Sequence, residues 1–368
     1  MQSNKELFFF IGTEAELIKL APIINRLNSL HVPFKLISTG QNDLSKSRLL
    51  KECHKGKIDI LLSTETIKKT PLGLFEWWLK TYLAAPKKLD KYLSKNQGSI
   101  IIVHGDTIST FMGALLAKKY GLEVAHVEAG LRSFHLLSPF PEELDRVLTS
   151  RNATIHFAPN EWALGNLKHK HGAKINTYNN TLIEALEYSE KFKTEDPIFS
   201  HLPKKFFIFA FHRQENLLNK KLVRDTITEI IKISEEIPCI FIGHAPTLAT
   251  LTEVGIIDDV KNNPNITIMP RLQYFDFMEL IKKSEFVISD GGSNQEELYY
   301  LDKPGLILRK RTERIEGLGE NIILYKGNLG LIQQFAKGYK DYKKKTTPTQ
   351  KVPSEIIVEE LLKRINNG

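Results

Sequence analysis

The residues best suited to chemistry gather in one stretch of the chain, from Val103 to Arg146. An unpaired charge is costly to bury, so ionisable groups at the ends of buried strands need a reason to be there. Ligands of α/β sheets bind at the carboxyl ends of the strands, so this stretch predicts an active site of carboxylates with cations close by. The groups concerned stand at the ends of apolar runs or near glycine: His104, Asp106, His126, Glu128, Arg132, Glu142, Glu143 and Arg146.

Asp106, Glu128 and Glu142 are the candidate acid–base groups of this site. The competing interpretation is that they cap helices or form internal salt bridges with Arg132 and Arg146. The chain has no nucleophile elbow and no HExxH, its HGD and HVE fragments lack metal-ligand spacing, and no DxD motif is present. We therefore expect neither a metal nor another cofactor, and a diphosphate would be held by helix N-termini and arginines.

One glycine turn in the second half of the chain could hold that diphosphate. Gly291 and Gly292 lie between an apolar run and a helical one, which lets an anion approach backbone N–H groups. A plain tight turn explains the same glycines. Glu296 and Glu297 follow in the first turn of the helix, where one could reach a sugar hydroxyl or both could simply favour the helix dipole.

Basic residues follow two other apolar runs. His212 and Arg213 suit a diphosphate, although His212 could instead be a packing histidine. Arginine forks bind phosphate well, and a surface ion-pair network is the competing interpretation for the arginines after the second run. These arginines, with their neighbouring carboxylates, are Arg309, Arg311, Arg314, Glu313 and Glu316.

Apolar runs that predict strands alternate with amphipathic runs that predict helices. Thr13 and Glu16 open the first helix as a T-x-x-E capping box, which is compatible with a phosphate-facing helix N-terminus. Continuous apolar strands between helices imply parallel sheets covered on both faces. The first set of strands is expected at 7–12, 34–39, 58–63, 99–105, 123–130 and 153–159. After a pause over 174–203, a second set is expected at 206–212, 237–244, 265–270, 286–292 and 305–309.

The predicted fold class is therefore α/β, with two doubly wound, Rossmann-like domains that face a cleft at their strand ends. The 368 residues of the chain suit two such domains. The N-terminal α/β domain is expected over residues 1–172, with the C-terminal helix 354–368 packing back on it. The C-terminal, nucleotide-binding α/β domain is expected over residues 173–353.

Composition narrows the class of partner. The net charge of +8 suits an anionic small substrate, and the lysine-rich run Lys337–Lys351 is interpreted as a solvated loop, since no nucleic-acid module accompanies it. Two distant cysteines, Cys53 and Cys239, argue against a disulfide framework and fit a cytoplasmic location. The apolar runs are too short for a signal or a membrane span, so we expect no membrane insertion and no nucleic-acid partner.

These fragments together resemble the UDP-N-acetylglucosamine 2-epimerase family. HVEAGLR followed by SPFPEE at the spacing seen here is highly specific. The resemblance implies a two-domain, glycosyltransferase-B-like fold. The matching pieces keep the family's order over nearly the whole chain: IGTEAELIKLAPI, STGQN, VHGDT, HVEAGLRS, SPFPEELDR, FHRQEN, SDGGSNQEE and RTERIE.

The resemblance also implies roles for single residues. Asp106, Glu128 and Glu142 match the family's catalytic carboxylates, and His212 matches its catalytic histidine. Arg146 matches a substrate-site arginine. Lys19 matches a lysine near the cleft. On the UDP side the expected residues are His244, Phe277 (against the uracil), Gly291, Gly292, Ser293, Glu297 and Arg314.

Family members invert C2 of UDP-GlcNAc by eliminating UDP to 2-acetamidoglucal and adding it back, whereas a hydrolysing branch adds water and releases ManNAc. The resemblance predicts an isomerase of the non-hydrolysing branch, acting on UDP-GlcNAc or a related UDP-2-acetamido sugar. The expected protein is a cytoplasmic homodimer that serves surface polysaccharide synthesis.

Three alternatives stay open: a hydrolysing epimerase, a glycosyltransferase of the same fold, and a nucleotide-sugar-binding regulatory protein without turnover. The last arises because the family's GTRPE reads GTEAE here. Glu14 in place of the arginine would repel a diphosphate unless its carboxylate points away.

Overall fold

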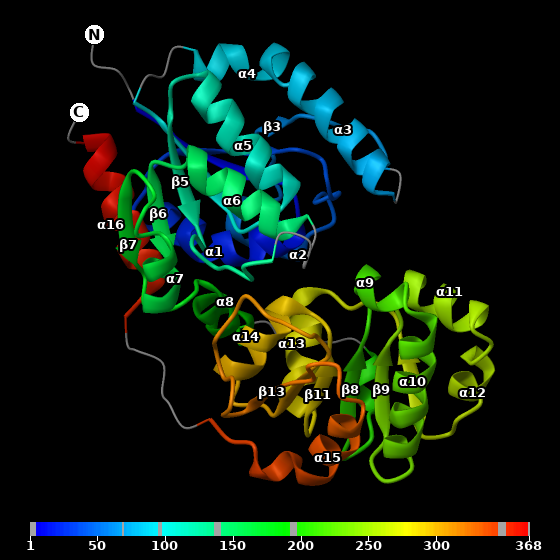
Figure 1. Ribbon diagram of the computed structural model, residues 1–368. Helices are drawn as coiled ribbons and strands as arrows, with labels where there is room; N and C mark the ends of the chain where they lie inside the picture. The colour runs from blue at the N-terminus through cyan, green and yellow to red at the C-terminus, as the bar shows by residue number, and fades with distance from the viewer. Residues whose placement is uncertain are drawn as a thin grey trace. The chain divides into compact units, whose positions relative to one another are not determined.

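The computed structural model describes residues 5–67, 70–94, 98–135, 141–191, 197–344 and 351–366 (Figure 1). Residues named above that lie outside these ranges include Ser138, Pro139 and Phe140 of the SPFPEELDR motif, residues 345–350 of the lysine-rich run and residues 367–368 of the expected C-terminal helix. Contacts divide the chain into unit 1, which comprises Met1–Ala185 and Thr349–Gly368, and unit 2, which comprises Leu186–Pro348.

Unit 1 is built on a parallel sheet whose seven strands, counted over the described residues, have the order β3-β2-β1-β4-β5-β6-β7. The strands are β1 (Leu7–Ile11), β2 (Phe34–Ser38), β3 (Ile60–Leu61), β4 (Ile100–His104), β5 (Glu123–Val127), β6 (Ile155–Ala158) and β7 (Ala173–Asn176). The helices are α1 (Glu14–Ser29), α2 (Arg48–His54), α3 (Pro71–Ala84), α4 (Pro86–Leu93), α5 (Ile108–Lys119), α6 (Glu142–Asn152), α7 (Glu161–Asn166), α8 (Leu182–Ser189) and α16 (Pro353–Asn366).

Unit 2 repeats the plan with six parallel strands among the described residues, in the order β10-β9-β8-β11-β12-β13. The strands are β8 (Phe207–Ala210), β9 (Cys239–Ile242), β10 (Ile266–Met269), β11 (Val287–Ser289), β12 (Gly305–Ile307) and β13 (Ile322–Leu324). The helices are α9 (Gln214–Leu217), α10 (Lys220–Ser234), α11 (Ala245–Glu253), α12 (Ile257–Lys261), α13 (Tyr274–Lys283), α14 (Gly292–Tyr300) and α15 (Gly330–Gly338), with short 3-10 turns at Pro197–His201 and Tyr339–Asp341.

Both faces of the unit 2 sheet are buried, as continuous apolar strands require. Along β8, Phe207 and Phe209 belong to one core cluster, while Ile208 and Ala210 belong to another on the opposite face. The prediction of two doubly wound α/β units is confirmed, and each predicted strand contains an observed one.

Two edge strands, β7 and β13, were not predicted. The residues of β7 (AKIN) are only partly buried or exposed, so they form no apolar run, and β13 has only three residues. Because β7 pairs with β6, residues 173–185 belong to unit 1, whereas the sequence suggested a boundary at 172.

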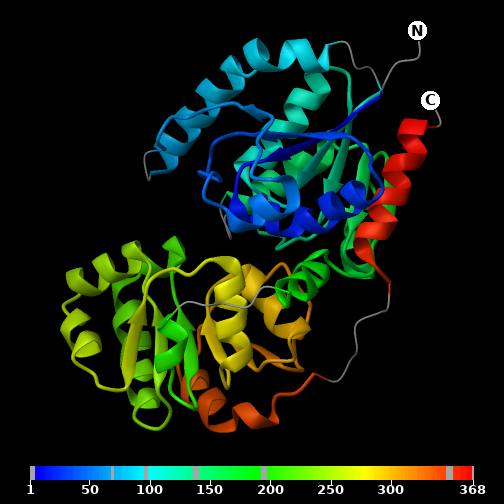
Figure 2. The ribbon, with the colours of Figure 1, turned by 180° about the vertical axis from the view of Figure 1, so that it is seen from behind.

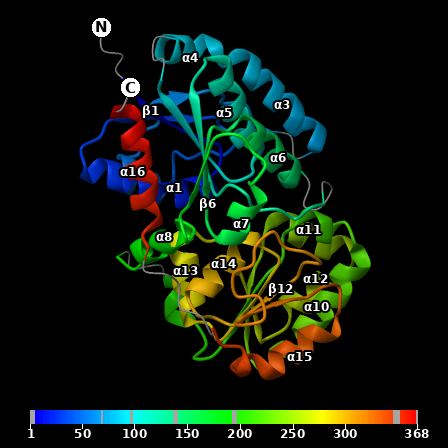
Figure 3. The same ribbon diagram turned by 60° about the vertical axis from the view of Figure 1, so that its left-hand side comes forward.

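The C-terminal helix α16 belongs to unit 1 and packs against α1, as Figures 2 and 3 show in two further views. The Arg26 Nε atom donates to the Ser354 hydroxyl at 3.0 Å, and the Ser354 backbone N–H donates to Glu184 at 2.7 Å. These contacts hold the start of α16 on unit 1, although α16 follows unit 2 along the chain. No helix in the described part of the chain is long and apolar enough to cross a membrane.

Candidate active site

Each sheet reverses its strand order at one point, and predicted site residues lie beside both points. In unit 1 the reversal falls between β1 and β4, which pair in parallel, so the loop after β1 meets the loop that carries Asp106. In unit 2 it falls between β8 and β11, so His212 meets Asp290. Such switch points are where doubly wound sheets bind ligands, because the flanking loops diverge there.

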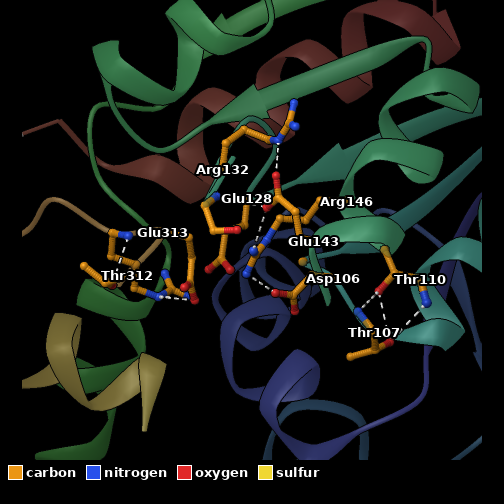
Figure 4. Close-up of polar contacts among 12 residues, drawn as sticks. Asp106, Thr107, Thr110, Glu128, Arg132, Glu143, Arg146, Thr312 and Glu313 are labelled. Atoms are coloured by element: carbon orange, nitrogen blue, oxygen red, sulfur yellow. Dashed lines mark hydrogen bonds and ion pairs between the residues drawn. The ribbon is translucent and has the colours of Figure 1, made fainter. Parts of the chain in front are cut away.

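Arg146 and Glu143 of α6 hold the loop of Asp106 through a chain of charged contacts (Figure 4). The Arg146 guanidinium donates to Asp106 Oδ2 and, at 3.3 Å, to Glu143 Oε2. Glu143 Oε1 accepts from Arg132 Nε at 2.6 Å, and the Ser133 N–H donates to Oε2 at 2.9 Å. Burial alone would raise the pKa of Glu143, but these donors outweigh it and lower the pKa. The Asp106–Arg146 pair is one of the internal salt bridges of the competing interpretation, and Glu143, which that interpretation did not include, pairs with both arginines.

Glu128 directly follows β5 and is buried together with its partners. Its Oε2 atom lies 2.5 Å from Lys19 Nζ and 3.7 Å from His104 Nε2, and it accepts from the Asn180 side chain. The backbone of Glu128 has a φ of 64°. A non-glycine residue in this region is strained, and such strain is found at functional sites where the surroundings hold the residue in place. The structure thus brings Lys19 and Glu128 together, and adds Asn180, which the sequence did not single out.

Glu142 is the first residue of α6, and Asp145 lies one turn later. Burial, followed by the negative charges of Asp106 and Glu142, raises the pKa of Asp145 to about 8. Asp106, Glu142 and Asp145 therefore share one electrostatic environment, and the last of them is largely protonated near neutral pH.

The raised pKa of Asp145 predicts a pH-dependent loss of stability. The folded state binds this proton up to about pH 8, whereas an unfolded Asp (model value 3.8) does not, so stability falls as pH rises through this range. Asp145→Asn should therefore gain about 1–3 kcal/mol relative to the wild type between pH 6.5 and 8.5, the usual cost of a buried group without its partner. Denaturant unfolding at both pH values measures this.

The two pH values are kept at 6.5 and above because burial lowers the pKa of His126 to about 4. At lower pH, His126 would take up a proton on unfolding and add its own pH dependence to the stability. Asp259→Asn, at an exposed carboxylate, is the matched control and should show no pH-dependent gain. An equal free-energy difference at both pH values would show that Asp145 is already ionised at neutral pH.

In unit 2, Asp290 fixes the loop that carries His212. The buried carboxylate accepts from the backbone N–H groups of His212 at 3.0 Å and Arg213 at 2.8 Å, and from the Asn216 side chain at 3.1 Å. Its Oδ1 atom lies 3.1 Å from His212 Nδ1. Burial alone would raise the pKa of Asp290, but the His212 ring and these donors lower it. A histidine oriented by a buried carboxylate suits acid–base chemistry.

The His212 ring stacks on His244, with ring centroids 4.6 Å apart. Burial, followed by the neighbouring His212, lowers the pKa of His244 to about 4, so this ring is neutral near pH 7.

The glycine turn before α14 makes room for side chains. A Cβ at Gly291 would lie 2.3 Å from Asn294 Oδ1, and a Cβ at Gly292 would lie 3.1 Å from Arg309 Nη1. The glycines are therefore required by packing at the N-terminus of α14, beyond the needs of a turn. Ser293 follows in the first turn and is partly buried.

Of the three arginines that follow β12, Arg309 and Arg314 are paired with carboxylates in a buried cluster, whereas Arg311 is exposed. Arg309 lies 2.9 Å from Glu313, and Arg314 Nη1 lies 2.5 Å from Glu296 Oε2. The predicted alternative of a surface network is wrong in one respect, since these side chains are almost fully buried. Two other nucleotide-side candidates have contacts of their own: Glu297 accepts from Asn294 at 2.7 Å, and Phe277 packs partly buried against the core.

The chain matches the sequence profile described as UDP-N-acetylglucosamine 2-epimerase over residues 26–351. It belongs to the UDP-N-acetylglucosamine 2-epimerase family. The UDP-N-acetylglucosamine 2-epimerase of Methanocaldococcus jannaschii is 32% identical over 335 residues, which cover 87% of this chain and 88% of that protein. The Bacillus subtilis protein of the same name is 29% identical, over 95% of this chain and 93% of its own.

Solved structures of UDP-N-acetylglucosamine 2-epimerases have the same fold. The M. jannaschii enzyme in complex with UDP-GlcNAc and UDP gives a TM-score of 0.83 at 30% identity, covering 97% of this chain and 99% of that one. The Neisseria meningitidis enzyme bound to UDP-GlcNAc gives 0.81 at 27% identity, covering 98% and 100%. The resemblance seen in the motifs is therefore confirmed at the level of family and fold.

The predicted site residues of this epimerase-family chain fall into two sets, one on each unit. Lys19, Asp106, Glu128, Glu142 and Arg146 lie on unit 1. His212, His244, Phe277, Gly291, Gly292, Ser293, Glu297 and Arg314 lie on unit 2.

Glu14, the departure from the family's GTRPE, accepts a hydrogen bond from the Ser47 hydroxyl at 2.7 Å. Ser47 caps α2, so the Glu14 carboxylate is directed toward the start of that helix. This geometry weakens the argument that Glu14 must repel a diphosphate.

Proposed function

We propose that this family member is a non-hydrolysing UDP-GlcNAc 2-epimerase, which interconverts UDP-GlcNAc and UDP-ManNAc or closely related UDP-2-acetamido sugars. The observation that carries the proposal is the pairing of two of the three candidate bases with cations, Glu128 with Lys19 and Asp106 with Arg146. Paired carboxylates stay ionised when buried and can accept a proton. A glycosyltransferase on the same fold needs no base for C2, so these groups favour an epimerase.

The reaction follows from the chemistry of the sugar. C2 has no neighbouring carbonyl to make its proton acidic, so the C1–O bond must break first, with its electron pair leaving on UDP. The oxocarbenium-like centre at C1 then acidifies the C2 proton, and a carboxylate takes it to give 2-acetamidoglucal. Return of a proton to the other face of C2, and of UDP to C1, gives the epimer.

The assignment of single steps to residues is part of the proposal. Asp106, Glu128 and Glu142 act on the sugar, and His212, oriented by Asp290, exchanges a proton. Arg146 and Lys19 hold the carboxylates in place. The hydrolysing alternative shares the first half of this sequence and differs in the addition of water to C1.

Proton NMR of UDP-GlcNAc with the purified protein and a metal chelator tests the function. UDP-ManNAc signals should grow until an equilibrium mixture is reached, with the total UDP-sugar constant. A spectrum that does not change would support a regulatory protein without turnover.

UDP is proposed to bind unit 2 at the N-terminus of α14, near His244, Ser293 and Glu297, with Phe277 against the base. A helix N-terminus attracts phosphate, and Arg314 lies in the adjoining buried cluster. Arg314→Ala should weaken UDP binding by about 1–3 kcal/mol, as expected for the loss of a charged hydrogen bond. Calorimetry without added metal measures the affinity.

Loss of Arg314 also leaves Glu296 without this partner, so the measurement is repeated in a Glu296→Gln background, which removes the orphaned charge. The control is Arg224→Ala. The Arg224 guanidinium donates to the Val254 carbonyl in an exposed contact of unit 2. Unchanged UDP affinity in both Arg314 variants would remove Arg314 from the site.

We also propose that the chain forms a homodimer through α3. Leu72, Phe75, Leu79 and Leu83 recur at helical spacing and are 77%, 53%, 41% and 67% exposed. A stripe of this kind on a soluble domain marks an interaction site. Leu72→Glu with Leu83→Glu should convert a dimer to a monomer in sedimentation velocity, while Leu30→Glu, at an isolated exposed leucine, should not. A wild-type chain that sediments as a monomer would overturn this proposal.

We also propose that the protein acts in the cytoplasm. Cys53 and Cys239 are both free and buried, which fits a reducing cytoplasm. UDP-ManNAc-type sugars made there would supply surface polysaccharide synthesis.

A further inference from the structure

The carboxylate of Glu16 joins two loops at the switch point of unit 1. Its Oε2 atom accepts from the backbone N–H groups of Gly12 at 2.8 Å and Thr13 at 2.6 Å, in the loop after β1. Its Oε1 atom accepts from the hydroxyls of Thr107 at 2.8 Å, at the end of the loop after β4, and of Thr110 at 2.9 Å, in the first turn of α5. The side chain is buried, so these bonds are shielded from water.

The capping box accounts for only half of these contacts. Thr13 and Glu16 do form the predicted box at the start of α1. That box uses Oε2, since both the Gly12 and the Thr13 N–H groups donate to this oxygen. The bonds from Oε1 reach residues more than ninety positions away and contribute nothing to the cap of α1.

The loop held by Oε1 is the one that carries Asp106. Thr107 directly follows Asp106 and is the N-cap of α5. The Thr110 hydroxyl also lies 2.6 Å from the His104 carbonyl oxygen and shares its one proton between this oxygen and Glu16 Oε1, so Thr110 connects Glu16 to the residue at the end of β4. Glu16 therefore fixes the main chain on both sides of Asp106, while Arg146 holds the Asp106 carboxylate itself.

We propose that Glu16 is a positioning residue that sets the place of the Asp106 carboxylate through Thr107 and Thr110. This inference rests on the proposed function for its effect on catalysis. A displacement of a reacting group by about 1 Å costs about 10²-fold in rate, so the support of Asp106 should be visible in kcat. Because UDP is proposed to bind unit 2, its affinity should not depend on Glu16.

Thr110→Val tests this contact, because it removes one hydroxyl at nearly constant volume and leaves the capping box of α1 intact. Thr110 also belongs to the capping box of α5, so the loss of a helix cap needs its own control. We expect kcat to fall at least about tenfold, with KM and the UDP dissociation constant within about twofold of the wild type. Thr110→Ser restores the hydroxyl and should restore kcat. Glu16→Ala should lower kcat further if it folds, and the proposal does not depend on that variant.

Two further measurements separate positioning from general destabilisation. Asn219→Ala removes the N-cap of α10, a helix of unit 2 that carries no predicted site residue. This variant should lower the melting temperature without changing kcat. Hydrogen exchange of the segment 104–110 should become faster in Thr110→Val than in the wild type or Thr110→Ser.

Thr110→Val with wild-type kcat and unchanged exchange would overturn the proposal, as would an equal fall of kcat in Asn219→Ala. If the wild-type protein shows no turnover, the proposed function fails instead. The exchange measurement alone then decides whether Glu16 holds this loop through Thr110.

Discussion

Asp106→Asn, Glu128→Gln and Glu142→Gln are each expected to lower kcat by about 10²-fold or more, the usual contribution of an acid–base group. An amide keeps the size and the hydrogen-bonding oxygen of the carboxylate but cannot accept the C2 proton or stabilise a developing cation with a full charge. Steady-state kinetics on UDP-GlcNAc, with unfolding curves for each variant, separates lost chemistry from lost structure.

Glu123→Gln is the matched control for this series. Glu123 begins β5, the strand that Glu128 follows, and it pairs with Arg364 at 2.9 Å. Its removal should leave kcat within about twofold, since it lies at the amino end of the strand, away from the switch point. A folded Asp106, Glu128 or Glu142 variant with near-normal kcat would reduce that residue to a structural role.

Lys19→Met is expected to destabilise the fold by about 3–5 kcal/mol, the usual cost of leaving one charge of a buried pair without its partner. Both side chains of the Lys19–Glu128 pair are 4% exposed, so water cannot replace the lost cation. Equilibrium unfolding in denaturant measures the loss.

The double variant Lys19→Met with Glu128→Gln removes both charges and should recover most of the lost stability. It should remain inactive, because the proposed base is gone. Arg26→Met is the control, since Arg26 lies on the same helix and pairs with Glu355 at a half-exposed position. Equal stability of Lys19→Met and Arg26→Met would mean that Glu128 is neutral in the folded protein.

The strands beside the switch points were predictable from sequence because they are buried on both faces, whereas the strand order that creates the switch points is seen only in the fold. Continuous apolar runs are typical of parallel strands that are covered on both faces of a sheet. Such runs precede Gly12, Gly105, His212 and Asp290. Ala173–Asn176 was not predicted as a strand because its residues are only partly buried or exposed and form no apolar run.

The supports of the site could not be read from sequence because their partners are distant along the chain. Asn180 contacts Glu128 across 52 positions, and Asp290 contacts the His212 backbone across 78. Glu143 resembles its neighbour Glu142 in sequence, and only the fold shows that Glu143 holds Arg132 and Arg146. The type of a residue suggests its chemistry, whereas its role as reactant or support depends on what the fold places against it.

The measurement that tests the central claim most directly is the reaction of UDP-GlcNAc with the protein in deuterium oxide, followed by NMR and mass spectrometry. Elimination and re-addition of UDP predict deuterium at C2 of an intact UDP-sugar, with free UDP as a trace product. Free ManNAc with stoichiometric UDP would place this chain with the hydrolysing branch. A C2 epimer without deuterium would contradict the elimination mechanism itself.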